Sequence, residues 1–134
     1  MPDSRYRTSA GCVFTLKYHF VWCPKYRLKV LTDEVAERLK ELLYEKAEEN
    51  KMVIDALEIM PDHVHLFVSV DPTKAPQRIA NQFKGYTSRI LRKEFADLRS
   101  RMPTLWSRSY SVGSVGHVSE ETVKKYIEAQ ETSY

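Results

Sequence analysis

Long apolar runs are absent from this chain of 134 residues, and its first residues, Met1 to Thr8, lack the apolar stretch of a signal peptide. Because a helix that crosses a bilayer needs about 20 consecutive apolar residues, the sequence excludes such a helix and we expect a cytosolic protein. The sequence also has no P-loop, so ATP is not an expected ligand. Only two cysteines occur, Cys12 and Cys23, at opposite ends of one predicted strand, and they form no CxxC pair. We therefore expect reduced, structural thiols.

A large excess of charge of one sign is also missing. The net charge of +3 and the pI of about 8.8 do not by themselves indicate a protein that binds nucleic acid. The positive charge is nevertheless concentrated, because residues 74–108 contain nine lysines and arginines against two acidic residues. Residues 33–58 are acidic on balance. One half of the chain is therefore predicted to be basic.

The hydrophobic pattern divides the chain into alternating strands and helices. Cys12 to Trp22 alternates polar and apolar residues with a period of two, which is typical of a half-buried strand. Thr32 is the predicted N-cap of a helix to about Asn50, and Pro76 begins a helix to about Phe95. The remaining predicted elements are strands at Met52 to Met60, Val64 to Val70 and Ser109 to Val115, a loop containing Met102 and Pro103, and a final helix from Ser119.

The order of these elements predicts the fold class. Strand, helix, strand, strand, helix and strand is the βαββαβ order of ferredoxin-like, α+β folds, in which a four-stranded antiparallel sheet carries two helices on one face. We expect a single domain over residues 1–134, with the C-terminal helix as an addition. RNA-recognition domains use the same arrangement and leave one sheet face open to a ligand.

His63 and His65 lie two residues apart on a predicted strand. Residues with this spacing point to the same face, with Cα atoms about 7 Å apart, so the two imidazoles can chelate one ion. The ordinary alternative is one packed and one solvated histidine. An ion would need a third ligand, and we expect an oxygen donor because no cysteine is near. Such a donor set suits Mg²⁺ or Mn²⁺ in phosphoryl chemistry, with zinc left open.

Tyr126 and Gln130 lie four residues apart on the final predicted helix and share one of its faces. A nucleophile and an oxygen ligand could therefore share that face. A phenol has a pKa of about 10, so it needs a nearby cation to favour the phenolate and to neutralise the phosphate that it approaches. Packing is the ordinary alternative for a tyrosine on an amphipathic helix.

Together these motifs resemble a known family. Pro-Asp-His-Val-His-Leu around His63 and His65 is followed about sixty residues later by Lys-Tyr-Ile-Glu-x-Gln, which contains Tyr126 and Gln130. This combination resembles the single-tyrosine HUH transposases of small bacterial and archaeal insertion sequences, the TnpA type. Tyr18 to Arg27 and the segment from Leu105 to Gly116 extend the resemblance over nearly the whole chain.

The resemblance implies a dimeric, metal-dependent enzyme that recognises hairpins formed by single-stranded element ends. Such an enzyme cleaves each end to leave a 5′-phosphotyrosine and a free 3′-OH, and then reseals strands with that hydroxyl. The resemblance makes Tyr126 the nucleophile and His63, His65 and Gln130 the protein ligands of the metal. It also implies that the tyrosine helix of one subunit can lie against the histidines of the other.

The basic residues are candidates for contacts with DNA phosphates, although any one of them could equally belong to a solvated surface. The predicted contacts are Lys25, Arg27, Arg78, Lys84, Arg89, Arg92 and Lys93. Three other functions stay open at this point: a non-catalytic module that binds single-stranded nucleic acid, a phosphodiesterase in which the metal activates water, and a domesticated nuclease that acts on chromosomal palindromes.

Overall fold

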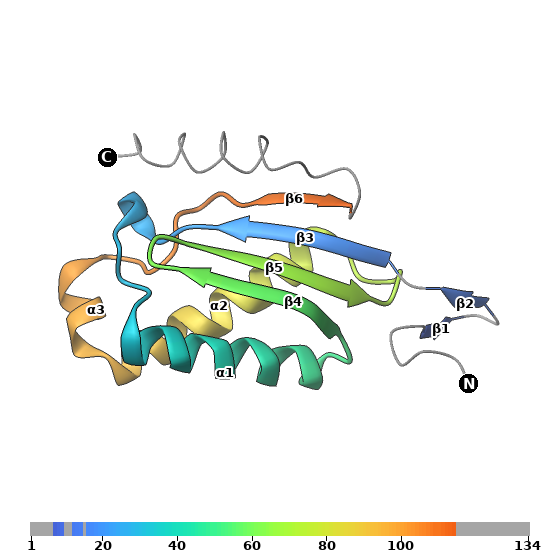
Figure 1. Cartoon of the computed structure of the whole chain (residues 1–134), viewed down its shortest axis with the longest axis horizontal. Helices are drawn as coiled ribbons and strands as arrows, with labels where there is room; N and C mark the ends of the chain where they lie inside the picture. Colours follow the sequence, from blue (N-terminus) through green and yellow to red (C-terminus); the bar gives the residue numbers. More distant parts are fainter. Residues whose placement is uncertain (1–6, 10–11, 15, 115–134) are drawn as a thin grey trace.

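The sheet that carries both histidines has four strands (Figure 1). The structure is a computed structural model that describes residues 7–9, 12–14 and 16–114. The strands lie in the order β4 (Val53–Met60), β5 (His63–Val70), β3 (Leu16–Trp22) and β6 (Ser111–Ser114). In this order β5 and β3 are the central strands, and β4 and β6 are the edge strands. Each strand is antiparallel to its neighbours.

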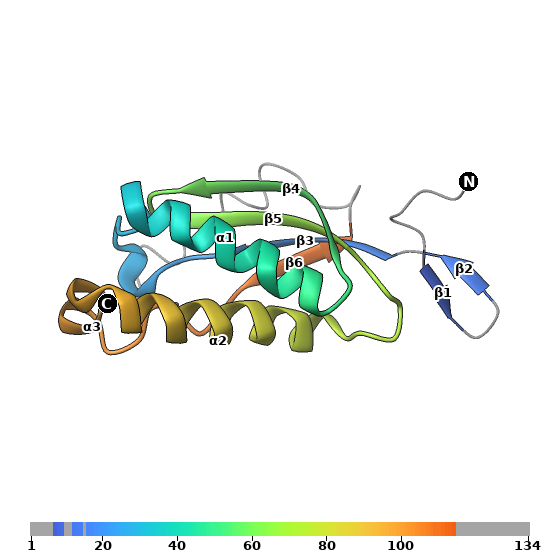
Figure 2. The ribbon, with the colours of Figure 1, turned by 90° about the horizontal axis from the view of Figure 1, so that it is seen from below.

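Two long helices cover one face of this sheet (Figure 2). They are α1 (Asp33–Glu49) and α2 (Pro76–Glu94), and they pack against each other beneath the strands. Their apolar faces contribute fully buried side chains to the core, among them Leu42 from α1 and Phe83 from α2. The element order and the placement of both helices on one face confirm the predicted α+β, ferredoxin-like fold.

Strict alternation along β5 determines which side chains face the helices. Val64, Leu66, Val68 and Val70 are all completely buried in the core between sheet and helices. Successive side chains of a strand point to opposite faces, so His63 and His65 must lie on the face that α1 and α2 leave open. The apolar positions of β5 therefore hold the histidines on the outer face, because a shift in register of one residue would expose the valines.

The start of α1 agrees with the sequence, but the expected side-chain cap is absent. Thr32 is the N-cap residue, yet its side chain makes no capping hydrogen bond. Its backbone carbonyl instead accepts hydrogen bonds from the N–H groups of Val35 and Ala36. Pro76 is the first residue of α2, as predicted, where its lack of an N–H costs nothing.

The predicted strand from Cys12 to Trp22 is divided between two sheets. Its first part is β2 (Cys12–Phe14), which pairs with β1 (Arg7–Ser9), whereas β3 of the main sheet begins at Leu16. The reason is the length of the neighbouring strand, because β5 ends at Val70 and Val70 is the register partner of Leu16. The described residues before Leu16 therefore have no register partner on β5. Cys23 directly follows β3 and is free and buried, in agreement with a structural thiol.

A short helix occupies part of the predicted loop after α2. Phe95 adopts an extended conformation (φ −118°, ψ 95°), and α3 (Ala96–Arg101) follows it. The break has no glycine or proline to mark it, and the Phe95 side chain packs against the core instead. Val115 and the predicted final helix lie outside the described residues. No helix in the described part of the chain has both the length and the apolarity to cross a membrane.

Candidate metal centre

His63 and His65 project together from the open face of β5. Their ring centroids are 4.8 Å apart and their planes are inclined at 56°. Both residues are half-buried, which leaves them reachable from solvent. The structure thus brings together the two residues that the sequence singled out, at a separation at which both rings can turn toward one ion.

Asp62 orients His63 through a hydrogen bond to its Nδ1 atom. One carboxylate oxygen of Asp62 lies 2.7 Å from Nδ1 of His63, and the other lies 2.8 Å from Nε of Arg27. The Nδ1–H group therefore donates to the carboxylate, and this leaves Nε2 as the nitrogen that can offer a lone pair. A carboxylate behind a histidine is the usual partner of a metal-binding imidazole, because it fixes the tautomer and raises the basicity of the ring.

Arg27 reaches Asp62 from a tight turn. This turn is η1 (Lys25–Arg27), in which Tyr26 (φ 59°) and Arg27 (φ 53°) both adopt the left-handed conformation. Non-glycine residues adopt this conformation at an energetic cost, and such residues concentrate at functional sites. The backbone of Lys25 is tied to the carbonyl of Leu105 by a hydrogen bond of 2.8 Å, which anchors the turn to the segment before β6.

His19 on β3 holds His65 in a similar way. Nε2 of His19 lies 3.3 Å from Nδ1 of His65, and the His19 ring is stacked on Phe67 with centroids 4.0 Å apart and planes within 7° of parallel. His19 is only 4% exposed. From the sequence, His19 lies on the polar face of its strand and could be either a partner behind a metal ligand or a surface residue. Spacing within one strand does not decide between the two, because it does not give the register that brings His19 beside β5.

The surroundings of His65 and of buried His19 favour their neutral forms. Burial lowers the pKa of His65, and the nearby His63 lowers it further, while Glu58 on β4 acts in the opposite direction. Burial and the neighbouring His65 lower the pKa of His19 to about 4. Since only the neutral imidazole has a lone pair for a metal ion, low pKa values favour metal binding at neutral pH.

The donor set fits a divalent cation but is incomplete within the described residues. His63 and His65 each have Nδ1 occupied by a partner, so the Nε2 atoms are the available ligands. The part of the chain that the structure describes contains no group of three or more His, Cys, Asp or Glu side chains placed to hold a metal ion. A further ligand must come from elsewhere. Tyr126 and Gln130, the predicted nucleophile and third ligand, lie outside the described residues, as does the rest of the predicted final helix.

Three of the predicted DNA-contacting cations already have partners within the protein. Arg27 pairs with Asp62, Lys84 donates to the carbonyls of Ser107, Arg108 and Ser109, and Arg92 donates to the carbonyl of Met102. Burial lowers the pKa of Lys84 to about 8.

Three of the other four predicted cations are exposed. Arg78, Arg89 and Lys93 are exposed on α2, and half-buried Lys25 has its ammonium 5.4 Å from the ring centroid of Tyr26. Contact with DNA stays a prediction for all seven residues.

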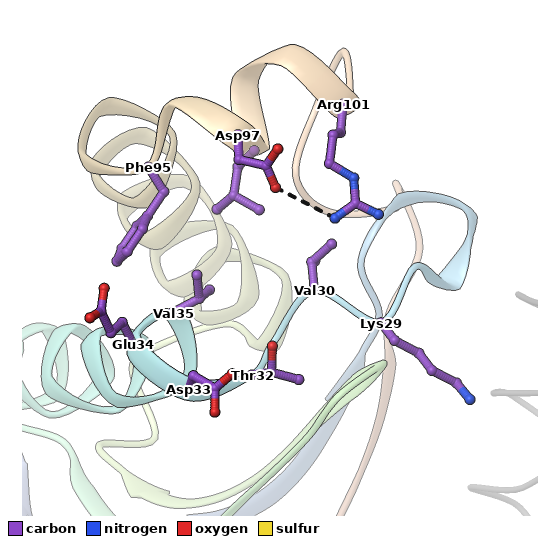
Figure 3. Close-up of a pocket in the computed structure, with 10 residues that line it drawn as sticks. Lys29, Val30, Thr32, Asp33, Glu34, Val35, Phe95, Asp97 and Arg101 are labelled. Atoms are coloured by element: carbon purple, nitrogen blue, oxygen red, sulfur yellow. Dashed lines mark ion pairs between the residues drawn. The ribbon is translucent and has the colours of Figure 1, made fainter.

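A cavity of about 470 Å³ lies apart from the histidines, between the start of α1 and α3 (Figure 3). Its lining includes three carboxylates, from Asp33, Glu34 and Asp97, and Arg101 is paired with Asp97 at 3.6 Å. Lys29 points away from the cavity. This lining does not favour a phosphate group, and neither histidine of the pair contributes to it.

Comparison with known proteins gives consistent matches over most of the chain. Residues 12–130 match the family model described as "Transposase IS200 like". The chain is 37% identical over 122 residues to the ISDra2 transposase TnpA of Deinococcus radiodurans, covering 90% of this chain and 87% of that protein. It is 29% identical over 116 residues to the transposase of insertion sequence IS200 from Salmonella typhimurium, covering 85% and 76% of the two chains.

Solved structures agree with this assignment. A crystal structure of a transposase from Deinococcus radiodurans superposes with a TM-score of 0.82 at 37% identity, covering 92% of this chain and 97% of that chain. A REP-associated tyrosine transposase bound to a REP hairpin gives a TM-score of 0.51 at 13% identity, covering 84% and 62%, which shows a shared fold alone. The family match and the ISDra2 relative show that the chain belongs to the IS200-like, single-tyrosine transposases and is an enzyme that acts on DNA.

Proposed function

We propose that this enzyme cleaves and rejoins single-stranded DNA at hairpin-marked ends of an insertion sequence, through a covalent 5′-phosphotyrosine on Tyr126. The observation that carries the proposal is the histidine pair on the open sheet face, with Asp62 and His19 occupying the Nδ1 atoms and leaving both Nε2 atoms available. A site of this kind holds a divalent cation against a phosphate, which is what a tyrosine nucleophile needs.

The reaction consists of two transesterifications. The phenolate oxygen of Tyr126 attacks the scissile phosphorus, the new P–O bond to tyrosine forms, and the P–O3′ bond breaks. The departing 3′ oxygen takes up a proton and becomes a free 3′-OH. In the second step a 3′-OH attacks the phosphotyrosine, the DNA phosphodiester is restored and the phenol is released. Each step exchanges one phosphoester for another, so the cycle needs no ATP.

His63, His65 and Gln130 would hold the metal, Mg²⁺ or Mn²⁺. When bound, this ion supplies positive charge that polarises the scissile phosphate. Gln130 lies one helical turn after Tyr126, so a helix that brings its amide to the histidines also brings the phenol near the phosphate. We further propose a homodimer in which this helix can come from either subunit, with Gly116 allowing the change of direction. Gly113 lies within β6 as the register partner of His19 and is not needed for this change.

Two other functions predict different products. A phosphodiesterase in which water attacks the phosphate leaves no DNA attached to the protein. A binding module without catalysis leaves the DNA intact. A domesticated nuclease would perform the same chemistry on chromosomal palindromes, and palindromes immediately outside both ends of the reading frame would argue for a mobile element instead.

The test is the covalent adduct. We expect wild-type protein, incubated with Mn²⁺ and a labelled single-stranded oligonucleotide that contains the palindrome beside its reading frame, to give a labelled band that survives denaturing electrophoresis. Tyr126→Phe removes the nucleophile and should give no such band. Tyr44→Phe is the matched control, because Tyr44 is an exposed tyrosine on α1, and it should form the adduct at the wild-type rate. An adduct with Tyr126→Phe, or none with wild type, overturns the proposed mechanism.

A further inference from the structure

We propose that His19 is a positioning residue for the metal site: it holds the imidazole of His65 in the tautomer and orientation that present Nε2 to the ion. This inference rests on the proposed function, because it assumes that His65 is a metal ligand. His19 itself binds neither metal nor substrate in this proposal. It acts only through His65.

The register of the sheet creates the contact. Val21 is the register partner of His65, and His19 is the register partner of Phe67. His19 is therefore the diagonal neighbour of His65 on the same face, at a distance that long and aromatic side chains bridge. The observed separation of 3.3 Å between Nε2 of His19 and Nδ1 of His65 is that of a hydrogen bond, so this nitrogen of His19 is not free to bind an ion.

The positions of the protons on the two rings determine the direction of the hydrogen bond between His65 and His19. A metal ion on Nε2 of His65 requires the lone pair of that nitrogen, so the proton of the neutral ring must sit on Nδ1. The Nδ1–H group of His65 then donates to Nε2 of His19, which must be the unprotonated nitrogen of His19. The stack on Phe67, with planes within 7° of parallel, fixes the plane of the acceptor ring.

Packing alone does not explain a histidine at this position. Nδ1 of His19 is buried and has no hydrogen-bond partner in the described part of the chain. A buried polar atom without a partner destabilises a protein, and an apolar ring of similar size would avoid that cost. The benefit of the histidine must therefore lie in its other nitrogen, which is the one that faces His65.

Two substitutions separate positioning from packing. His19→Phe retains an aromatic ring that can stack on Phe67 but removes the acceptor for His65. His19→Gln removes the ring but keeps an amide oxygen near the position of Nε2. The readout is direct binding of Mn²⁺ to the metal-free protein, followed by the loss of the electron paramagnetic resonance signal of free Mn²⁺, with thermal unfolding of the metal-free proteins measured alongside.

We expect His19→Phe to weaken Mn²⁺ binding by about 10- to 100-fold, the usual effect of losing a partner behind a metal ligand, without lowering the unfolding temperature of the metal-free protein. His19→Gln should recover most of the affinity. Wild-type affinity in His19→Phe, or equal losses of affinity and unfolding temperature in both variants, overturns the proposal. His63→Ala distinguishes failure of the proposed metal site from failure of the proposed role of His19. If neither His63→Ala nor His19→Phe reduces Mn²⁺ binding, the metal site itself is wrong. If His63→Ala reduces Mn²⁺ binding and His19→Phe does not, only the role of His19 is overturned.

Discussion

Asp62 and His19 hold the two imidazoles by different chemistry. Asp62 is a carboxylate, and its hydrogen bond to His63 is charge-assisted, although Arg27 shares the same carboxylate. His19 is a neutral ring that offers His65 an acceptor without a charge. We infer that His63 is the more electron-rich of the two proposed ligands, and that His65 depends more on orientation.

The buried His19 should also make the stability of the protein sensitive to acid. Its pKa of about 4 in the folded protein is below the ordinary value of 6.5, so the unfolded chain binds more protons between these two values. Its contribution is therefore fully present above pH 6.5 and is lost as the pH falls toward 4, by about 3 kcal/mol in the free energy of unfolding. His19→Phe lacks this group and should lose correspondingly less.

Urea unfolding of the metal-free proteins, at neutral pH and again near pH 4 in the presence of a chelator, measures this difference. The pKa of half-buried His65 is shifted by burial, His63 and Glu58, and all three are present in both proteins, so the difference between the proteins is expected to come mainly from His19. Equal losses of stability in wild type and His19→Phe would show that position 19 does not respond to pH.

Lys84 on α2 connects the helix to another part of the fold, a role that the charge pattern of the sequence did not indicate. Lys84 donates from its ammonium to the carbonyls of Ser107, Arg108 and Ser109, at 2.8 to 3.2 Å, and so ties the middle of α2 to the segment that enters β6. We expect Lys84→Met to lower the free energy of unfolding by roughly 1 to 3 kcal/mol, because these carbonyls lose a charged donor.

Lys93→Met is the matched control for this prediction. Lys93 is on the same helix but is exposed, and its replacement should change stability by less than about 0.5 kcal/mol. Chemical denaturation of both variants near neutral pH gives the comparison. Similar values for the two would mean that the Lys84 ammonium gains no more from the carbonyls than it would gain from water.

Elements with a strong period were predictable from the sequence, and elements that depend on a neighbour were not. Helices α1 and α2 and the pair β4 and β5 carry their own apolar faces, and their predicted bounds agree with the structure within about two residues. The division of Cys12 to Trp22 depends instead on where β5 ends. The break at Phe95 depends on a side chain that packs against the core.

The candidate site also has a part that the sequence predicted and a part that depends on neighbouring strands. The spacing of His63 and His65 placed them on one face because a strand has a period of two. The hydrogen-bond partners of the two histidines could not be assigned from the sequence, for different reasons. Asp62 lies between two predicted strands, where an aspartate is an ordinary turn residue, and His19 comes from a strand more than forty residues earlier in the chain. A contact between strands requires their register, which the periodicity of each strand leaves undefined.

The molecule separates its proposed chemistry from much of its positive charge. Helix α2, which carries several of the predicted DNA contacts, lies under one face of the sheet (Figure 2), and the alternation along β5 places the histidine pair on the other face. A DNA phosphate bound at α2 would therefore come from a different part of the DNA than a phosphate bound at the proposed metal site. Arg78 and Arg89 are exposed predicted contacts that can act together, since they are eleven residues, or about three helical turns, apart on one face of α2.

Salt dependence tests whether this face of α2 binds DNA. Each phosphate contact adds about 0.7 for a single strand, or about 0.9 for a duplex stem, to the slope of log affinity against log salt concentration. Arg78→Gln/Arg89→Gln should therefore reduce the steepness of that slope by about 1.4 to 1.8. Lys40→Gln/Lys51→Gln removes the same charge from exposed positions on α1 and just after it, and should change the slope much less. Fluorescence anisotropy with a labelled hairpin oligonucleotide at several salt concentrations provides both slopes. Equal slopes for the two double variants would identify Arg78 and Arg89 as a solvated surface. Mn²⁺ binding at His63 and His65 should be unchanged in both double variants, because the substituted residues lie on the other side of the sheet from the histidine pair.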